Sequence, residues 1–446
     1  MTEHTITGRF GSGREVRRIE DASLLKGAGR FTDDVSLPSQ AHLVFLRSPH
    51  AHARINAIDT MAARAKPGVI AVLTGADLAK AGVKPLPLAP IFKRPDGSPG
   101  ATPLRPALAT GTVRFVGEAV AAVIAETRAQ AKDAMEAIEV LYEELPVVTD
   151  LSSATENGAP LIWPEATGNI AAQMRHGDTA AAEAAFKAAA HVVALDLVNQ
   201  RLAPTPMEPR SVLANYDVSS DRLTLHLSSQ TPSGARDTLC DAVLGIPREK
   251  VRVVVGDVGG GFGMKTGLYS EDIVVAHAAR HLRRPVKWTA ERIEELLAAT
   301  HGRDTESHAE LALDADGKVL AYRIRTLANV GAYGGTSGII IQLLIGPWVS
   351  TSIYDIRTID FELNAVLTNT APTGPYRGAG RPEAIYLIER LFDMAAHQLG
   401  LDPVEIRRRN LIQPGQMPYT NAMGQVYDSG KFGSIIDQAV ALAKWT

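Results

Sequence analysis

A glycine-rich stretch between two regular segments carries the clearest chemical signal in the chain. Residues 256–265 read G-D-V-G-G-G-F-G-M-K and follow the β-branched run 251–255, which predicts a buried strand. The periodic segment 272–281 comes next and predicts a helix. Consecutive glycines allow positive φ and a close approach of the backbone. Their bare amides, beside the start of a helix, can bind an anion.

Three interpretations of this loop stay open from its own residues. A P-loop requires G-x-x-x-x-G-K-[ST], but Met264 stands directly before Lys265. A dinucleotide fingerprint requires G-x-G-x-x-G, and counting from Gly259 the sixth position is again Met264. The third interpretation is a tight structural turn, which needs glycine but no ligand.

A second glycine-containing loop favours a ligand. Residues 375–384 read P-Y-R-G-A-G-R-P-E-A. Together the two loops resemble the xanthine dehydrogenase family of molybdenum hydroxylases, whose molybdopterin-binding subunit places G-G-G-F-G and a later [FY]-R-G-x-G against a pterin cofactor. Three further stretches, at 27–34, 47–53 and 116–121, are similar to the N-terminal α/β hammerhead domain of that family.

The resemblance implies roles for individual residues. Gln230 matches a glutamine at an oxo ligand of molybdenum, and Arg377 matches an arginine beside the metal; without the resemblance they are a polar strand end and a surface ion-pairing residue. The implied sets are catalytic (Gln230, Arg377), molybdenum ligand sphere (Gln230, Phe262, Arg377), cofactor-binding (Gly260, Gly261, Phe262, Gly263, Arg377, Gly378) and substrate channel (Thr266, Tyr376, Ala379). The implied cofactor is molybdopterin cytosine dinucleotide with molybdenum, which needs amide donors and arginine for its anionic groups.

Three departures from the family pattern bear on which substrates the protein oxidises and on which residues complete its active site. Purine oxidisers follow the glycine loop with K-E, whereas Thr266 follows Lys265 here, which disfavours a purine substrate. Carbon monoxide dehydrogenases carry a cysteine where this chain has Gly378, which disfavours carbon monoxide. The glutamate that acts as general base in the family is expected beyond Thr446.

Composition excludes several classes of protein. The chain has 446 residues, 45% of them apolar and 21% charged, as in an ordinary globular protein. A net charge of −3 gives no basic surface for nucleic acid or membrane. The single cysteine, Cys240, excludes an iron–sulfur cluster ligated by this chain and predicts a buried small apolar residue. Ile19, Glu20 and Asp21 follow Arg17 and Arg18 in place of the apolar stretch of a signal peptide, so we expect a cytoplasmic protein.

The predicted fold is α+β, in four parts. We expect a disordered N-terminus (1–18), an α/β hammerhead domain (19–150), a linker (151–175) and the first part of a molybdenum cofactor-binding domain (176–446), whose C-terminal half is expected on other residues. His50 and His52 could share one face of a strand as metal ligands. With no third ligand nearby, we interpret them as turn and packing residues.

These observations predict a subunit that hydroxylates an aldehyde or an N-heterocycle with oxygen derived from water. Electrons would pass to a [2Fe-2S] small subunit and an FAD-binding medium subunit, and a C-terminal molybdopterin-binding half or subunit would complete the site. The alternatives are an inactive paralogue or assembly partner with the same fold, and, more distantly, a P-loop nucleotidase. The segment 434–446 has the apolar spacing of an amphipathic helix, and we expect the lone chain to expose it and to lack turnover.

Overall fold

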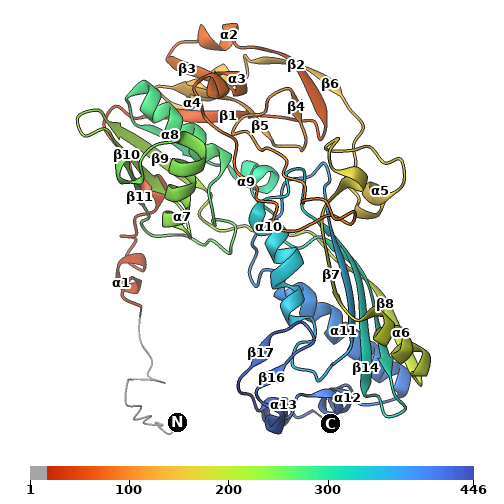
Figure 1. The fold of residues 1–446 in the computed structure, drawn as a ribbon. Helices are drawn as coiled ribbons and strands as arrows, with labels where there is room; N and C mark the ends of the chain where they lie inside the picture. Colours follow the sequence, from red (N-terminus) through yellow and green to blue (C-terminus); the bar gives the residue numbers. More distant parts are fainter. Residues whose placement is uncertain (1–17, 446) are drawn as a thin grey trace.

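The computed structural model describes residues 18–445, so all of the predicted disordered segment except Arg18 lies outside the described residues. The chain forms two lobes (Figure 1). The upper lobe holds the N-terminal strands together with α7 and α8, and the lower lobe holds the long strands around β14. Helices pack on mixed sheets in both lobes, which confirms the predicted α+β class.

A seven-stranded sheet organises the upper lobe. In spatial order its strands are β11 (Val251–Val254), β10 (Arg222–Leu227), β9 (Ser211–Asp217), β12 (Val286–Thr289), β1 (Ala41–Arg47), β5 (Ala119–Ala125) and β3 (Val69–Thr74). Strands β1 and β12 pair in parallel, with Ala41 opposite Val286. The sheet therefore joins strands from both sides of residue 150, and the predicted domain limits stay a proposal.

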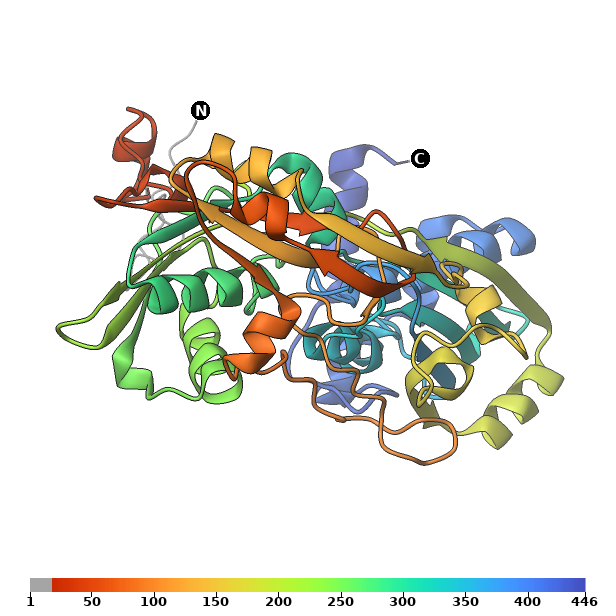
Figure 2. The same ribbon diagram turned by 90° about the horizontal axis from the view of Figure 1, so that it is seen from above.

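The N-terminal part adds a second, three-stranded sheet. It consists of β4 (Thr112–Val113), β2 (Ala53–Asp59) and β6 (Glu139–Glu144). The accompanying helices are α1 (Asp21–Leu24), α2 (Met61–Arg64), α3 (Gly75–Lys80) and α4 (Arg128–Met135), with a 3-10 turn at Thr32–Asp34. Seen from above, these red and orange segments lie over both the green and the blue parts of the chain (Figure 2). The N-terminal part thus covers the junction between the lobes.

Helices cover both faces of the upper sheet. Helix α8 (Ser270–Leu282) buries nearly its whole length against one face, because Ile273 to Ala276 and the alanines after them are apolar. Helix α4 covers the other face with Ala131 and Ala134. The remaining upper elements are α7 (Pro232–Asp237), a π-helical segment (Thr238–Leu244), a 3-10 turn (Arg248–Lys250) and α9 (Arg292–Ala298).

A five-stranded sheet forms the lower lobe. Its order is β7 (Ile170–Gly177), β15 (Ile359–Val366), β14 (Val319–Asn329), β13 (Thr305–Leu313) and β8 (His191–Asn199). Helix α11 (Arg381–Leu399) packs on one face through residues such as Phe392, and α6 (Thr179–Ala188) packs on the other through Ala182 (Figure 1). The other elements are α5 (Leu151–Thr155), α10 (Thr336–Ile340), α12 (Pro403–Asn410), α13 (Phe432–Ala443), β16 (Tyr419–Thr420), β17 (Val426–Tyr427), a π-helical segment (Ile341–Ile345) and 3-10 turns at Thr167–Asn169, Pro347–Val349 and Pro414–Gln416.

The elements predicted around the glycine loop are present as β11 and α8. Helix α11 ends at Gly400, which has the left-handed conformation typical of a helix C-terminus. The predicted linker 151–175 instead contains α5 and the start of β7. The predicted C-terminal helix is α13, which has no buried residue and leaves Leu442 86% exposed.

Membrane-spanning helices and clusters of metal-binding side chains are absent from the described residues. Across residues 18–445, no helix is long and apolar enough to cross a membrane. Over the same range, no three His, Cys, Asp or Glu side chains are arranged to hold a metal ion. His52 Nδ1 instead lies 2.7 Å from the carbonyl oxygen of Pro146, and His50 Nδ1 lies 3.5 Å from Glu144. Cys240 is buried, as predicted.

Candidate functional site

The glycine loop runs from the end of β11 to the start of α8 with several residues in the left-handed region. Gly260 has φ 101°, Phe262 has φ 52° and Gly263 has φ 94°. A side chain at Gly263 would place its Cβ 2.7 Å from the Pro375 carbonyl oxygen. Glycine is therefore required here both for conformation and for the close approach of the second loop.

Gln230 is tied directly to this loop. Its side-chain Oε1 accepts a hydrogen bond from the backbone amide of Gly263 at 2.8 Å. Its backbone amide donates to the Lys265 carbonyl oxygen at 2.8 Å. A Cβ on Gly261 would come within 2.5 Å of the same Oε1. Because Oε1 faces the amide, the Nε2 group of this exposed side chain points elsewhere, and it has no acceptor among residues 18–445. Gln230 therefore presents a neutral donor beside the loop.

Several backbone amides of the two loops have no acceptor within the described part of the chain. In the first loop these are the amides of Gly260, Gly261 and Phe262, and in the second loop the amides of Gly378 and Gly380. An amide that the fold leaves free is available to an anionic group.

An ion pair between Glu208 and Lys265 holds the glycine loop in place. Lys265 is only 1% exposed, and its Nζ lies 2.8 Å from both the Glu208 carbonyl oxygen and Glu208 Oε2. The same Oε2 accepts from the Gly259 amide at 2.8 Å and from the Ser228 hydroxyl at 2.7 Å. Burial lowers the pKa of Lys265, and Glu208 opposes that shift. This ion pair fixes the start of the loop to its end.

The second loop lies against the first. The Arg377 amide donates to the Phe262 carbonyl oxygen at 2.9 Å. Buried Arg303 supports the loop from behind, donating to the Arg377 carbonyl at 2.7 Å and pairing with Glu383 at 3.0 Å. The guanidinium of Arg377 itself is exposed and has no hydrogen-bond or ion-pair partner among residues 18–445. The fold therefore presents a free cation beside Phe262.

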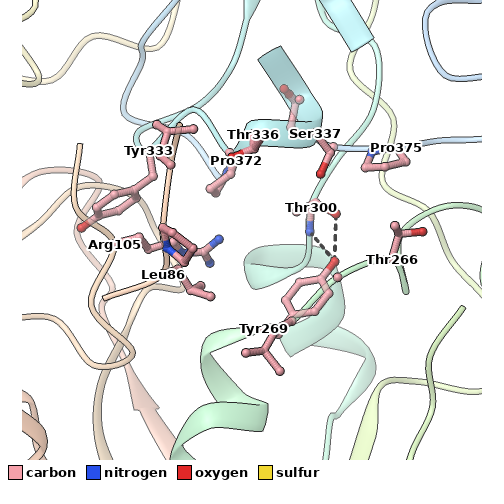
Figure 3. Close-up of a pocket in the computed structure, with 18 of the residues that line it drawn as sticks. Leu86, Arg105, Thr266, Tyr269, Thr300, Tyr333, Thr336, Ser337, Pro372 and Pro375 are labelled. Atoms are coloured by element: carbon pink, nitrogen blue, oxygen red, sulfur yellow. Dashed lines mark hydrogen bonds between the residues drawn. The ribbon is translucent and has the colours of Figure 1, made fainter. Parts of the chain in front are cut away.

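A cavity of about 360 Å³ opens where the two loops join the rest of the protein (Figure 3). Thr266 and Tyr269 reach it from the end of the glycine loop, and Pro372 and Pro375 reach it from the start of the second loop. The Tyr269 hydroxyl donates to the Met264 carbonyl at 2.6 Å and lies 2.8 Å from the Thr300 hydroxyl. The remaining lining residues are Leu86, Pro87, Leu88, Pro103, Arg105, Thr238, Gly267, Leu268, Thr300, Tyr333, Gly335, Thr336, Ser337, Gly338, Thr373 and Gly374.

A buried network of charged side chains contacts Tyr269, one of the residues that line this cavity. Arg210 pairs with Glu271 at 3.0 Å and with Glu295 at 2.8 Å, and Arg47 also pairs with Glu271 at 3.0 Å. Burial alone would raise the pKa of Glu271, but the two guanidinium groups hold it at about 2. Its neighbour Asp272 lacks such a pair, and burial raises its pKa to about 7. The network links the N-terminal part, the 201–210 segment and α8.

The structure brings together most of the residues singled out in the sequence. Gln230, Gly260 to Gly263, Arg377 and Gly378 form one surface made of both loops. Of the three predicted channel residues, Thr266 lines the cavity, whereas Tyr376 and Ala379 do not. The Tyr376 ring instead lies 4.9 Å from the Arg303 guanidinium.

Other residues of the site had no signal in the sequence. Glu208 lies in an extended loop, and Arg303 and Arg105 lie in segments without periodicity. Arg303 is also held at φ 62°, in a region where residues other than glycine are uncommon.

Comparison with known proteins identifies the fold around these loops. The sequence pattern of the molybdopterin cofactor-binding domain matches residues 162–411, more than half of the chain. The chain belongs to the xanthine dehydrogenase family of molybdenum hydroxylases. The hammerhead domain of aldehyde oxidase and xanthine dehydrogenase matches residues 26–146.

This family member is similar to subunits of several enzymes. It is 36% identical to the nicotine 6-hydroxylase large subunit of Paenarthrobacter nicotinovorans, over 95% of this chain and 51% of that protein. It is also 36% identical to the carbon monoxide dehydrogenase large chain of Hydrogenophaga pseudoflava, over 94% and 53% of the two chains. The crystal structure of quinoline 2-oxidoreductase from Pseudomonas putida 86 superimposes with a TM-score of 0.88 at 37% identity, covering 96% of this chain and 54% of that one. This chain thus spans about half the length of these relatives.

Proposed function

We propose that the chain forms part of a molybdenum-dependent hydroxylase that oxidises an aldehyde or an N-heterocycle with oxygen derived from water. The observation that carries this proposal is the hydrogen bond from the Arg377 amide to the Phe262 carbonyl, because it makes one surface of the two loops. The 360 Å³ cavity opens beside that surface and is within the usual size range of small-molecule sites.

The residues present fit an anionic pterin cofactor. Free amides at Gly260, Gly261 and Gly378 suit phosphate or oxo groups, and the unpaired guanidinium of Arg377 adds a positive donor fork. Gln230 adds a neutral donor whose orientation is fixed by Gly263. The cofactor form proposed is molybdopterin cytosine dinucleotide, which would supply the molybdenum centre for oxygen and electron transfer.

The chain's own residues have three tasks in this proposal. The Glu208–Lys265 pair keeps the amides of the glycine loop aligned, and Arg303 does the same for the second loop. Gln230 offers a donor whose orientation is fixed by Gly263, and Arg377 adds an unpaired guanidinium where charge develops at a reacting group. The cavity walls hold the substrate and exclude water from it, while Thr266 lies at the end nearest the glycine loop.

Two features of the site limit the range of possible substrates. Thr266 offers no carboxylate to a purine, so xanthine should bind poorly. A copper-holding cysteine is absent at Gly378, which disfavours carbon monoxide despite the similarity to carbon monoxide dehydrogenase chains. The proposed partners are a [2Fe-2S] subunit, an FAD subunit and a polypeptide carrying the C-terminal molybdopterin-binding part with its glutamate base.

Metal analysis of the purified complex tests the proposal. About one molybdenum per copy of this chain is expected from the single site. The variant G263A should lose most of it, because Gly263 has φ 94° and the added Cβ would lie 2.7 Å from the backbone carbonyl oxygen of Pro375. The matched control G234A should keep it, since a Cβ at Gly234 meets no atom closer than 3.8 Å. An active, folded complex that contains no molybdenum would overturn the proposal, and an inactive, metal-free one would favour the paralogue.

A further inference from the structure

One charged residue lines the cavity, and its guanidinium forms no ion pair within the described residues. Among the described lining residues, Arg105 alone carries a formal charge. No carboxylate of residues 18–445 lies within 4.0 Å of its guanidinium, and no hydrogen bond from that group is formed within this range. The nearby arginines differ, because Arg47 and Arg210 both pair with Glu271.

The position of Arg105 is fixed by its backbone and by aromatic neighbours. The Leu86 amide donates to the Arg105 carbonyl at 2.9 Å, which pins together two points of the 86–106 segment. The guanidinium carbon lies 5.9 Å from the ring centres of both Phe115 and Tyr333, at the limit of a cation–π contact. In Figure 3 the guanidinium nitrogens point toward the middle of the cavity. Arg105 is thus aimed at whatever occupies this space.

The charge of Arg105 acts on the buried carboxyl of Glu118, whose oxygens already accept hydrogen bonds from other donors. Glu118 is buried and accepts from the Tyr333 hydroxyl at 2.5 Å and from the Arg114 amide at 2.7 Å. Burial raises the pKa of the Glu118 carboxyl, and the hydrogen bonds from Tyr333 and Arg114 and the charge of Arg105 act against that shift. Glu118 therefore does not serve as the ion-pair partner of Arg105.

The rest of the cavity is uncharged and mostly apolar. Leu86, Leu88, Leu268, Tyr269 and Tyr333 supply aliphatic and aromatic surface. Arg105 lies at the left end in Figure 3, while Thr266 and Pro375 lie at the right end, next to the two loops. A ligand anchored at the left end would direct its opposite edge toward the loops.

We propose that Arg105 selects substrates that carry an anionic group, so that the cavity accepts planar aromatic monocarboxylates in preference to their uncharged analogues. A guanidinium and a carboxylate form charge-assisted, often bidentate bonds, which fix orientation as well as adding affinity. The inference rests on the proposed function only in taking the cavity as the substrate site.

Equilibrium binding tests this specificity without requiring turnover. The probes are two matched pairs, benzoate with benzamide and pyridine-3-carboxylate with pyridine-3-carboxamide, titrated at pH 7 into the protein as isolated with its subunits. Wild-type protein should bind each carboxylate about 10-fold or more tightly than its amide, the range of a charge-assisted bond. R105Q should bind both members of a pair equally, with amide affinity unchanged, and R105K should keep part of the preference.

The control variant is R54Q, because Arg54 is exposed, pairs with Glu143 and does not line the cavity. It should retain the full wild-type preference. Equal affinity for both members in wild type, binding of neither, or a preference that survives in R105Q would overturn the inference. Unchanged amide affinity shows that R105Q is folded. These outcomes are independent of metal content. A protein that contains molybdenum but shows no carboxylate preference would contradict this inference alone. A metal-free protein that shows the preference would contradict only the proposed function.

Discussion

Replacing Glu208 by Gln removes the counter-charge of a buried lysine while keeping the shape of the side chain. In the folded protein Lys265 is 1% exposed, and its ammonium lies 2.8 Å from Glu208 Oε2. Removing one partner of a buried ion pair leaves the other charge uncompensated, which typically destabilises a protein by about 3–5 kcal/mol. The effect should be at the upper end, because Gly259 and Ser228 also donate to the same oxygen.

Thermal unfolding measures this loss. An unfolding entropy of about 2.1 cal/mol/K per residue gives about 0.9 kcal/mol/K for 446 residues, so E208Q should lower Tm by about 3–5 °C. The control is E143Q, which breaks a pair with Arg54 in which both side chains are about half exposed. Exposed pairs contribute about 0–1 kcal/mol, so the control should shift Tm by about 1 °C or less.

A double variant checks the physical reason. In E208Q/K265M both charges are gone and the methionine side chain fills the buried space, so a large part of the lost stability should return. The reasoning is refuted if E208Q melts within about 1 °C of wild type, or if the double variant is no more stable than the single one.

Four further outcomes follow from the site. R377K should reduce turnover about 100-fold or more, as loss of a preorganised donor does, whereas R381K should stay near wild type; equal rates in both variants would contradict the role given to the second loop. Glu271 has a pKa of about 2 in the folded protein against an ordinary 4.5, so it contributes about 3 kcal/mol that is complete above about pH 4.5 and is lost as pH falls toward 2. Tm should therefore decline less steeply from pH 5 to 2.5 in E271Q than in wild type, and parallel curves would exclude this contribution. Y269F removes the hydroxyl that bonds the Met264 carbonyl and should lower the free energy of unfolding by about 1–2 kcal/mol in denaturant titrations; an unchanged midpoint would show that this bond adds nothing. Xanthine should have a far lower kcat/KM than an aromatic aldehyde because Thr266 provides no carboxylate, and efficient xanthine oxidation would rule out this account.

Local chemistry in the sequence predicted individual elements well. The β-branched run before Gly256 is β11, and the periodic segment after the glycine loop is α8. Each depends on residues that lie close together in the chain, so propensity and periodicity are sufficient.

Features that depend on distant pairing could not be predicted in this way. Nothing in the alternating pattern of β1 indicates that β12 is its neighbour, because periodicity defines a face and not a partner. Arg105 lies in a proline-rich segment with no period, and only the folded chain shows that its guanidinium enters the cavity. Arg303 reaches the second loop from a left-handed position that its own side chain does not favour.

The parallel pairing of β1 with β12 sets an order of events during synthesis. Ala41 leaves the ribosome long before Val286, its partner in the sheet. Until then β1 can pair with β5, but its other edge has free amides and carbonyls that invite pairing with another chain. Translation must therefore pass residue 289 before that edge is covered by β12, and N-terminal fragments that stop earlier should be prone to self-association.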